Sequence, residues 1–204
     1  LNKIKLILNP LKLKINIKTV GSKLKKKEKN IELENIKTQI SLSSLIENKF
    51  SIENLEISTK SIEINNLITF IRYFKNTPEL FILEKTVKKG YLIADIRLDF
   101  DSSGKIKDNY KINGFIKDAK LSILKKYNIQ KLNLLFAYEK DNLLLNDVSF
   151  SLNDLNFLFE NIFFKKNKDD FLVEGNLNNK NFDLDKKNLD LFIKPFFPEI
   201  DIVK

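Results

Sequence analysis

The side chains that usually carry out enzyme chemistry are scarce in this sequence of 204 residues. It contains no histidine and no cysteine, so the commonest general base, the thiol nucleophile and the usual ligands of zinc are all absent. Carboxylate pairs remain as a possible acid and base. Asp99 with Asp101 and Asp169 with Asp170, however, fall where solvated turns are expected. Because only five glycines are present, no phosphate-binding loop is indicated either. We therefore predict a protein that is not an enzyme and has no metal and no cofactor.

A lysine cluster near the start of the sequence is the other group with chemical potential. Residues 1–30 hold ten lysines and one glutamate, which accounts for the whole net charge of +9. Lys23, Lys25, Lys26 and Lys27 are candidates for contact with an anionic surface such as lipid head groups. A solvated hairpin tip is the simpler interpretation. Since residues 1–30 contain no aromatic ring on which a base could stack, we predict no nucleic-acid partner.

The elements that position these residues are predicted to be β-strands. Residues 11–18 alternate between aliphatic and polar side chains, and a strand with this pattern places its aliphatic groups on one face. The same alternation returns in residues 92–100 and 132–138, which are followed by polar turns at 101–104 and 139–142. Regular strands joined by short turns predict a mainly β fold, built as an antiparallel meander.

A second pattern shifts this alternation by one residue. After two apolar residues at alternate positions comes a turn-prone polar residue, and the alternation then resumes in the opposite phase. Four segments show it, at residues 31–38, 50–57, 127–134 and 143–150. A β-bulge at the polar residue would keep both halves of the segment on the same face of a sheet. A tight turn between two short strands is the competing interpretation.

Residues 66–89 depart from the strand pattern. The apolar residues between Leu67 and Phe74 follow helical spacing. Thr77 and Pro78 then have the order of an N-cap and a first helical residue, and Gly90 is placed to end the second helix. We predict a small helical insertion, an αα-hairpin over residues 66–89, that caps one end of the sheet or covers part of its apolar face.

The sequence is expected to be a single piece of a longer protein, with residues 1–204 in one domain. It contains no methionine, so residue 1 is not expected to be a translation start. No segment approaches the roughly 18 apolar residues of a membrane-spanning helix. The apolar, proline-broken tail over residues 191–198 is expected to lead into a following repeat.

Residues 89–107, KGYLIADIRLDFDSSGKIK, and residues 110–120, YKINGFIKDAK, resemble the AsmA-like proteins, a family that includes the TamB and YhdP types. Residues 35–38 and 54–59 are similar to the repeats of that family, and the resemblance extends loosely over most of the chain. It implies a long, curved sheet with an open apolar groove in the periplasm of Gram-negative bacteria. The parent protein would be anchored in the inner membrane by a segment outside this sequence. The family has no catalytic residues.

The resemblance also implies the function, which is to carry phospholipid or another acyl lipid between the inner and outer membranes in support of outer-membrane biogenesis. The candidate groove residues are the apolar members of the alternating segments, each of which could equally be ordinary core. They are Leu11, Leu13, Ile15, Ile17, Leu92, Ala94, Ile96, Leu98, Phe100, Leu132, Leu134 and Phe136. The alternative function is a structural β-scaffold or a protein-interaction module of the cell envelope. A fully covered apolar face would favour that alternative.

Overall fold

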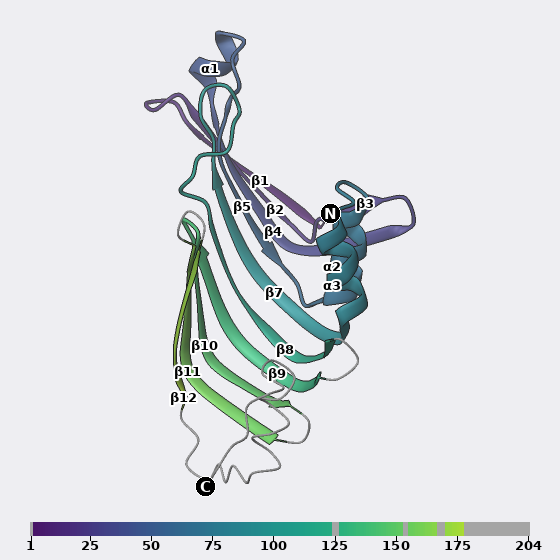
Figure 1. Cartoon of the computed structure of the whole chain (residues 1–204). Coiled ribbons are helices and arrows are strands. Elements are labelled where there is room, and N and C mark those ends of the chain that lie inside the picture. Colours follow the sequence, from purple (N-terminus) through teal and green to yellow (C-terminus); the bar gives the residue numbers. More distant parts are fainter. Residues whose placement is uncertain (1, 124–126, 153–154, 167–169, 178–204) are drawn as a thin grey trace, which may run out of the picture.

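The chain folds into one open, curved β-sheet. A computed structural model describes residues 2–123, 127–152, 155–166 and 170–177 (Figure 1). In these residues twelve strands form a sheet with the order β1-β2-β4-β5-β7-β8-β9-β10-β11-β12, while β3 pairs with β4 and β6 with β7. All pairs are antiparallel, and β1 and β12 are the two edges of the path. The predicted mainly β meander is confirmed. The tail at residues 191–198 lies outside the described residues.

The strands lengthen toward the middle of the sheet. Their bounds are β1 (Lys3–Asn9), β2 (Lys14–Val20), β3 (Lys23–Lys26), β4 (Lys29–Ser41), β5 (Ile52–Thr59), β6 (Ile62–Glu63), β7 (Val87–Asp99), β8 (Lys111–Ile123), β9 (Tyr127–Glu139), β10 (Asn142–Leu152), β11 (Leu155–Lys166) and β12 (Phe171–Leu177). The described helices are α1 (Leu42–Ile46), α2 (Ile64–Arg72) and α3 (Pro78–Thr86).

The four segments with shifted alternation form bulged strands, which confirms the bulge interpretation over the tight turn. Register shifts interrupt β4, β5, β9 and β10 within these segments, and each strand continues past its shift. Lys131 and Asp147 occupy the extra positions of β9 and β10, with φ of 52° and 50°. Asp118, with φ of 50°, has the same role in β8. One residue in the left-handed conformation brings the next apolar side chain back to the same face.

The bulges also explain why the sheet is curved. In the pairing of β8, β9 and β10 they fall at neighbouring positions, and each bulge bends its strand. The side chain of Asn133 connects two of them: its Oδ1 accepts a hydrogen bond from the N–H of Asp118 (3.0 Å), and its Nδ2 donates to the carbonyl of Lys131 (2.8 Å). Neighbouring strands therefore bend together, and the sheet forms a trough (Figure 1).

The predicted helical hairpin is present, with ends that differ from the prediction. Helix α2 begins at Ile64 and α3 ends at Thr86. The N-cap prediction is correct, because the hydroxyl of Thr77 accepts a hydrogen bond from the N–H of Leu80 (3.4 Å) and Pro78 is the first helical residue.

The predicted stop at Gly90 is wrong. Gly90 and the two lysines before it lie inside β7. At Gly90 φ is 139°, and a Cβ there would approach the Cα of Ala119 to 2.8 Å and Cδ1 of Ile64 to 3.0 Å. The glycine is needed because β7 passes close to β8 beneath the start of α2, a tertiary contact that local sequence does not reveal.

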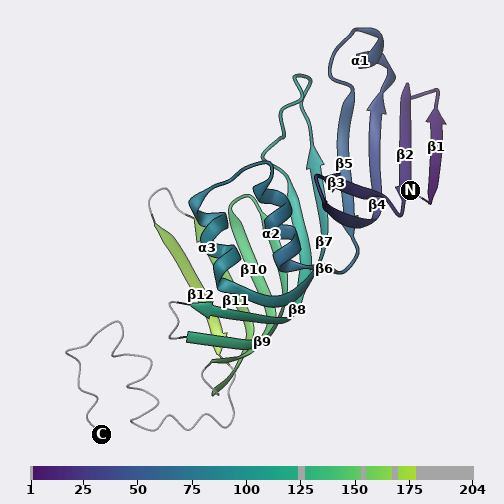
Figure 2. The same cartoon turned by 90° about the vertical axis from the view of Figure 1, so that its right-hand side faces the viewer.

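A compact core is found beneath the helices. Helices α2 and α3 pack against β4, β6, β7 and β8 and lie on the concave side of the sheet (Figure 2). The buried side chains there are Ile31, Leu33, Ile62 and Phe70, with Ile36, Ile57 and Leu67 packed around them. The prediction that the hairpin covers part of the apolar face is therefore confirmed.

Candidate functional site

The concave face of the sheet is the candidate functional site. Residues paired across antiparallel strands point to the same face, so the register assigns side chains to faces. One row takes a residue from each of ten neighbouring strands, and its members are Ile4, Thr19, Ile36, Ile57, Ile96, Ile112, Tyr138, Leu143, Phe164 and Val173. Since Ile36 and Ile57 also contact the core beneath α2, this row lies on the concave face.

The concave face is apolar from one edge of the sheet to the other. The inner members of the row are half-buried by their neighbours, whereas Ile4 and Val173 at the two edges are 54% and 55% exposed. All strands of the described residues belong to a single sheet, so no second sheet lies over this face. Where the helices do not reach, the face is a trough lined by hydrocarbon.

Nine of the twelve predicted groove residues lie on this face. They are Ile15, Ile17, Leu92, Ala94, Ile96, Leu98, Leu132, Leu134 and Phe136. Ala94 and Leu134 are buried, at 4% and 8% exposure, and the other seven are half-buried. The structure therefore brings side chains from β2, β7 and β9 together on one surface.

Leu11 and Leu13 are not on the sheet, and the prediction of one strand over residues 11–18 is wrong at its first three positions. Both leucines lie in the turn between β1 and β2, where Leu11 is 97% exposed. The side chain of Asn9 accepts a hydrogen bond from the N–H of Lys12 (3.1 Å), and the carbonyl of Pro10 accepts one from Leu13 (3.3 Å). This Asn-Pro turn overrides the alternating pattern.

Phe100 lies just beyond the end of β7. It forms an isolated bridge with Ile106, and its ring centroid is 5.5 Å from that of Phe50. The ring of Phe50 in turn packs on Gly104, in the turn predicted at 101–104. Phe100 therefore belongs to a small cluster at one end of the sheet, away from the helical cover.

Sequence reasoning missed an aromatic group on β10 and β11. The ring of Phe150 stacks on those of Phe157 and Phe159, with centroid distances of 5.2 Å and 6.2 Å. Ser149 pairs with Asn133, which points away from the concave face, so Phe150 points toward it. The apolar residues 155, 157 and 159 occupy alternate positions, as in a strand. Leu158 between two of them is also apolar and masks this alternation.

Tyr138, the member of the row on β9, carries a polar phenol hydroxyl. It lies 3.4 Å from the hydroxyl of Tyr110 and donates a hydrogen bond to Asp141 (3.2 Å). The hydrogen bond with Tyr110 is the main cause of a raised pKa of Tyr138, with burial and the Asp141 carboxylate adding to it. The hydroxyl therefore stays protonated at neutral pH and is a poor nucleophile.

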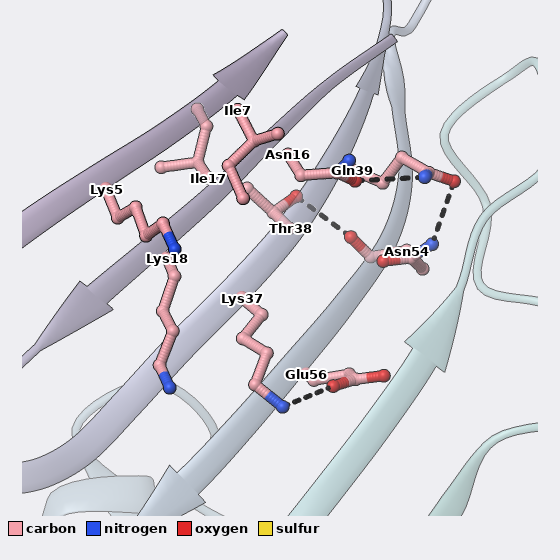
Figure 3. Close-up of a pocket in the computed structure, with 10 residues that line it drawn as sticks. All are labelled: Lys5, Ile7, Asn16, Ile17, Lys18, Lys37, Thr38, Gln39, Asn54 and Glu56. Atoms are coloured by element: carbon pink, nitrogen blue, oxygen red, sulfur yellow. Dashed lines mark hydrogen bonds and ion pairs between the residues drawn. The ribbon is translucent and has the colours of Figure 1, made fainter. Parts of the chain in front are cut away.

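The opposite, convex face mixes polar side chains with exposed apolar ones, among them Ile7, Ile93, Leu135 and Leu158. A shallow depression of about 380 Å³ on it is lined by residues of β1, β2, β4 and β5. Figure 3 shows these residues. Gln39 donates to the Oδ1 of Asn16 (3.0 Å), the Nδ2 of Asn54 donates to Gln39 (3.4 Å), and Lys37 pairs with Glu56 (3.2 Å). Because these groups satisfy one another and include no nucleophile beside a base, the depression is typical of a solvated sheet surface.

The four lysines predicted to contact an anionic surface lie on the β3–β4 hairpin, with Lys23 at the start of β3 and Lys27 in the turn. Lys23 forms an ion pair with Glu32 (2.6 Å). Lys26 and Lys27 reach the C-terminal end of α2, where their Nζ atoms lie 5.0 Å and 5.1 Å from the ring centroids of Phe74 and Tyr73. Lys25 is exposed in β3. The structure therefore joins the basic hairpin to the helical hairpin.

Within the described ranges, no group of three or more acidic side chains is placed to hold a metal ion. No helix in the same residues combines the length and apolar character needed to span a membrane. Comparison with family models, with curated proteins and with solved structures finds no match to this chain. The geometry of the concave face is therefore the main evidence about function.

Proposed function

We propose that the concave face carries the acyl chains of lipids and that the protein is a non-catalytic lipid-transfer module. The observation that supports this most directly is the apolar row from Ile4 to Val173, which runs across ten strands and has no second sheet over it among the described residues. Large apolar surfaces that remain accessible on a folded protein mark sites for lipids, for other hydrophobic ligands or for partner proteins.

The energetics of an acyl chain fit such a surface. Removing one CH₂ group from water is favourable by roughly 0.8 kcal/mol, so a tail of about 16 carbons gains on the order of 10 kcal/mol when it is fully covered. That amount is also the barrier that keeps a lipid from leaving a bilayer unaided. A hydrocarbon trough offsets much of the barrier without any specific polar contact, which suits transport because transport needs weak, repeated binding.

The dimensions of the row fit as well. Neighbouring strands are about 4.8 Å apart, so ten strands span roughly 43 Å. One leaflet contributes about half of the roughly 30 Å hydrocarbon core of a bilayer. The row meets the core beneath α2 at Ile36 and Ile57, so the stretch available to a tail is the part from β7 to β12. These six strands span roughly 24 Å, which still exceeds the length of one tail. The aromatic rings of Phe150 and Phe157 continue the apolar surface toward β11.

The resemblance to AsmA-like proteins supports the same function and suggests where it takes place. On that basis the transfer occurs in the periplasm, between the inner and outer membranes, and the parent protein is held in the inner membrane by a segment outside this sequence. The lipid is then a phospholipid, and its transfer supports outer-membrane biogenesis.

The proposal is tested by placing a photoreactive amino acid at Ile96, on the concave face, or at its neighbour Arg97, on the convex face. The two positions lie at the same height of β7, so they differ mainly in the face that they probe. We expect irradiation with phospholipid to label the protein at Ile96 and to leave Arg97 unlabelled, as measured by mass spectrometry of the adducts. Equal labelling at both positions would contradict an apolar conduit.

The structural or protein-interaction module remains a second candidate, favoured by the edge strand β1. Its concave residues Ile4, Leu6 and Leu8 are 54%, 65% and 60% exposed, which suits the addition of a partner strand. The substitution Ile96→Asp separates the two functions. A conduit loses lipid labelling at the half-buried Phe136 while the circular dichroism of the folded protein is kept, whereas a packed scaffold unfolds.

A further inference from the structure

We propose that the helical hairpin α2–α3 and the tip of the β3–β4 hairpin form a docking surface for an anionic membrane. The purpose of this docking rests on the proposed lipid-transfer function, because docking would bring lipid to the trough. The docking surface itself is indicated by other features, namely the outer surface of the helices and the charge around them.

The helical hairpin leaves an apolar patch exposed. Helix α3 has no buried residue, although four consecutive apolar side chains, Leu80 to Leu83, lie at its centre. Helices of soluble domains normally turn such residues toward a core. The patch, called here the docking patch, consists of Ile71 (39% exposed), Tyr73 (37%), Phe74 (64%), Phe81 (48%), Ile82 (63%) and Leu83 (44%).

Basic side chains surround the docking patch. Residues 23–29 hold five lysines and one glutamate, and residues 71–88 hold three lysines, one arginine and two glutamates. Glu84 forms an ion pair with Arg72, so its charge does not neutralise the lysines around the docking patch. No ion pair in the described part of the chain involves Lys25, Lys26, Lys27, Lys75, Lys85 or Lys88.

The cations lie among the aromatic rings of the patch. Four cation–π contacts lie here, with cation-to-centroid distances of 5.0 Å for Lys26 and Phe74, 5.1 Å for Lys27 and Tyr73, 5.3 Å for Arg72 and Phe81, and 5.5 Å for Lys85 and Phe81. A lysine that covers a ring with its stem can turn its ammonium group toward a phosphate while the ring enters the acyl boundary.

This combination favours a membrane over other partners. Aromatic and aliphatic side chains within a ring of lysines suit the interface of a bilayer, where head groups are anionic and the layer below them is apolar. A nucleic acid would leave Ile82 and Leu83 exposed to water. An acidic protein would have to supply an apolar anchor for the same residues, and its binding is an outcome of the test below.

The position of the patch suits the function. Helices α2 and α3 lie on the concave side of the sheet, and the β3–β4 hairpin stands beside them (Figures 1 and 2). Their inner residues pack against β4, β6, β7 and β8, so only their outer surface is available for docking. A membrane held there lies next to the uncovered part of the trough, where a lipid tail can enter it.

The sequence allows a clean spectroscopic test because it contains no tryptophan. Phe74→Trp places a single reporter in the docking patch, and Leu135→Trp places one at a 46% exposed position on the convex face of β9. With vesicles of equal parts phosphatidylglycerol and phosphatidylcholine, we expect the emission of the Phe74→Trp protein to shift to the blue and to be quenched by brominated lipid. We expect no change in the emission of the Leu135→Trp protein. Equal responses from both reporters would overturn the proposal.

Charge and apolar variants complete the test. In the Phe74→Trp protein, combining Lys25→Glu with Lys27→Glu should weaken vesicle binding by roughly tenfold or more, as should Ile82→Ser, whereas the matched pair Lys117→Glu and Lys120→Glu on β8 should not. Equal binding to pure phosphatidylcholine, or no binding to either vesicle, would overturn the proposal, and the second result would point to an acidic protein. If docking fails while Ile96 still captures a soluble short-chain lipid, only the docking proposal is wrong.

Discussion

At the scale of single residues, the side chain of Asn133 connects two bulges of the sheet. Its amide joins the bulge at Asp118 to the bulge at Lys131, so two strands bend at one place. A bulge leaves a backbone group without its partner in the ladder, and an amide side chain of the right length satisfies that group. The curvature of the trough thus depends partly on a side chain of the convex face.

We expect Asn133→Ala to lower the free energy of unfolding by about 1–3 kcal/mol, because two backbone groups lose a hydrogen-bond partner. Urea denaturation followed by circular dichroism measures this change. Asn113→Ala is the matched control, since Asn113 is exposed on the same face of β8, and it should cost less than about 0.5 kcal/mol. Equal effects of the two substitutions would show that the bulges do not depend on Asn133.

At the scale of elements, the β3–β4 hairpin is held by a carboxylate between two lysines. Glu32 of β4 lies 2.6 Å from Lys23 of β3 and 3.1 Å from Lys60. Hydrogen bonds from Lys23 and then Lys60, with their charges, lower the pKa of Glu32 from 4.5 to about 2. A pKa that is lower in the folded state means that the ionised carboxylate favours the folded hairpin.

The lowered pKa of Glu32 sets the direction in which the stability of the hairpin changes with pH. The contribution of Glu32 is fully present above pH 4.5, the ordinary pKa of a glutamate, and is lost as the pH falls toward 2. We expect amide-exchange protection of β3, corrected for intrinsic rates, to fall over this interval. Because Glu32→Gln carries no charge at any pH, its hairpin should be less protected at neutral pH and should lack this loss. The same loss in both proteins would assign the effect to other carboxylates.

The elements also show what could be predicted from the sequence. Alternation predicts which side chains share a face, but the phase shift at Asp147 left a bulge and a tight turn as alternatives. The strand pairing decides for the bulge, which keeps Leu145 and Val148 on the same side. The Asn9–Pro10 turn and the role of Gly90 were not predicted. The turn depends on a side chain that caps its own backbone, and Gly90 depends on contact with Ala119, which is remote in sequence.

At the scale of the whole molecule, the sheet is large and its compact core is small. The core cluster lies beneath α2, and outside it most concave side chains are half-buried, although Ala94, Leu134 and Val148 are buried. Most of the order in the sheet therefore comes from strand pairing and from neighbours on the same face. A domain of this kind keeps its apolar surface accessible without unfolding, which a lipid conduit needs, but it also keeps its edges accessible.

The accessibility of the sheet edges has its clearest consequence at strand β1. Natural edge strands avoid association by pointing a charge toward the apolar face, by proline or by a cover. Here Lys3 and Lys5 point to the convex face, and the concave side of β1 carries Ile4, Leu6 and Leu8. In the described residues β2 is the only strand that pairs with β1. The purified chain is therefore expected to self-associate through this edge.

We expect Leu6→Lys to prevent this association, because it places a charge on the concave, apolar side of the edge strand β1, where a second copy would have to bury it. Sedimentation velocity over a concentration series should show the dissociation constant rising by roughly tenfold or more. Leu135→Lys adds the same charge at an exposed position in the middle of the convex face and should leave association unchanged. If both variants sediment like the unchanged chain, association does not use β1. If both weaken association equally, net charge rather than the edge governs it.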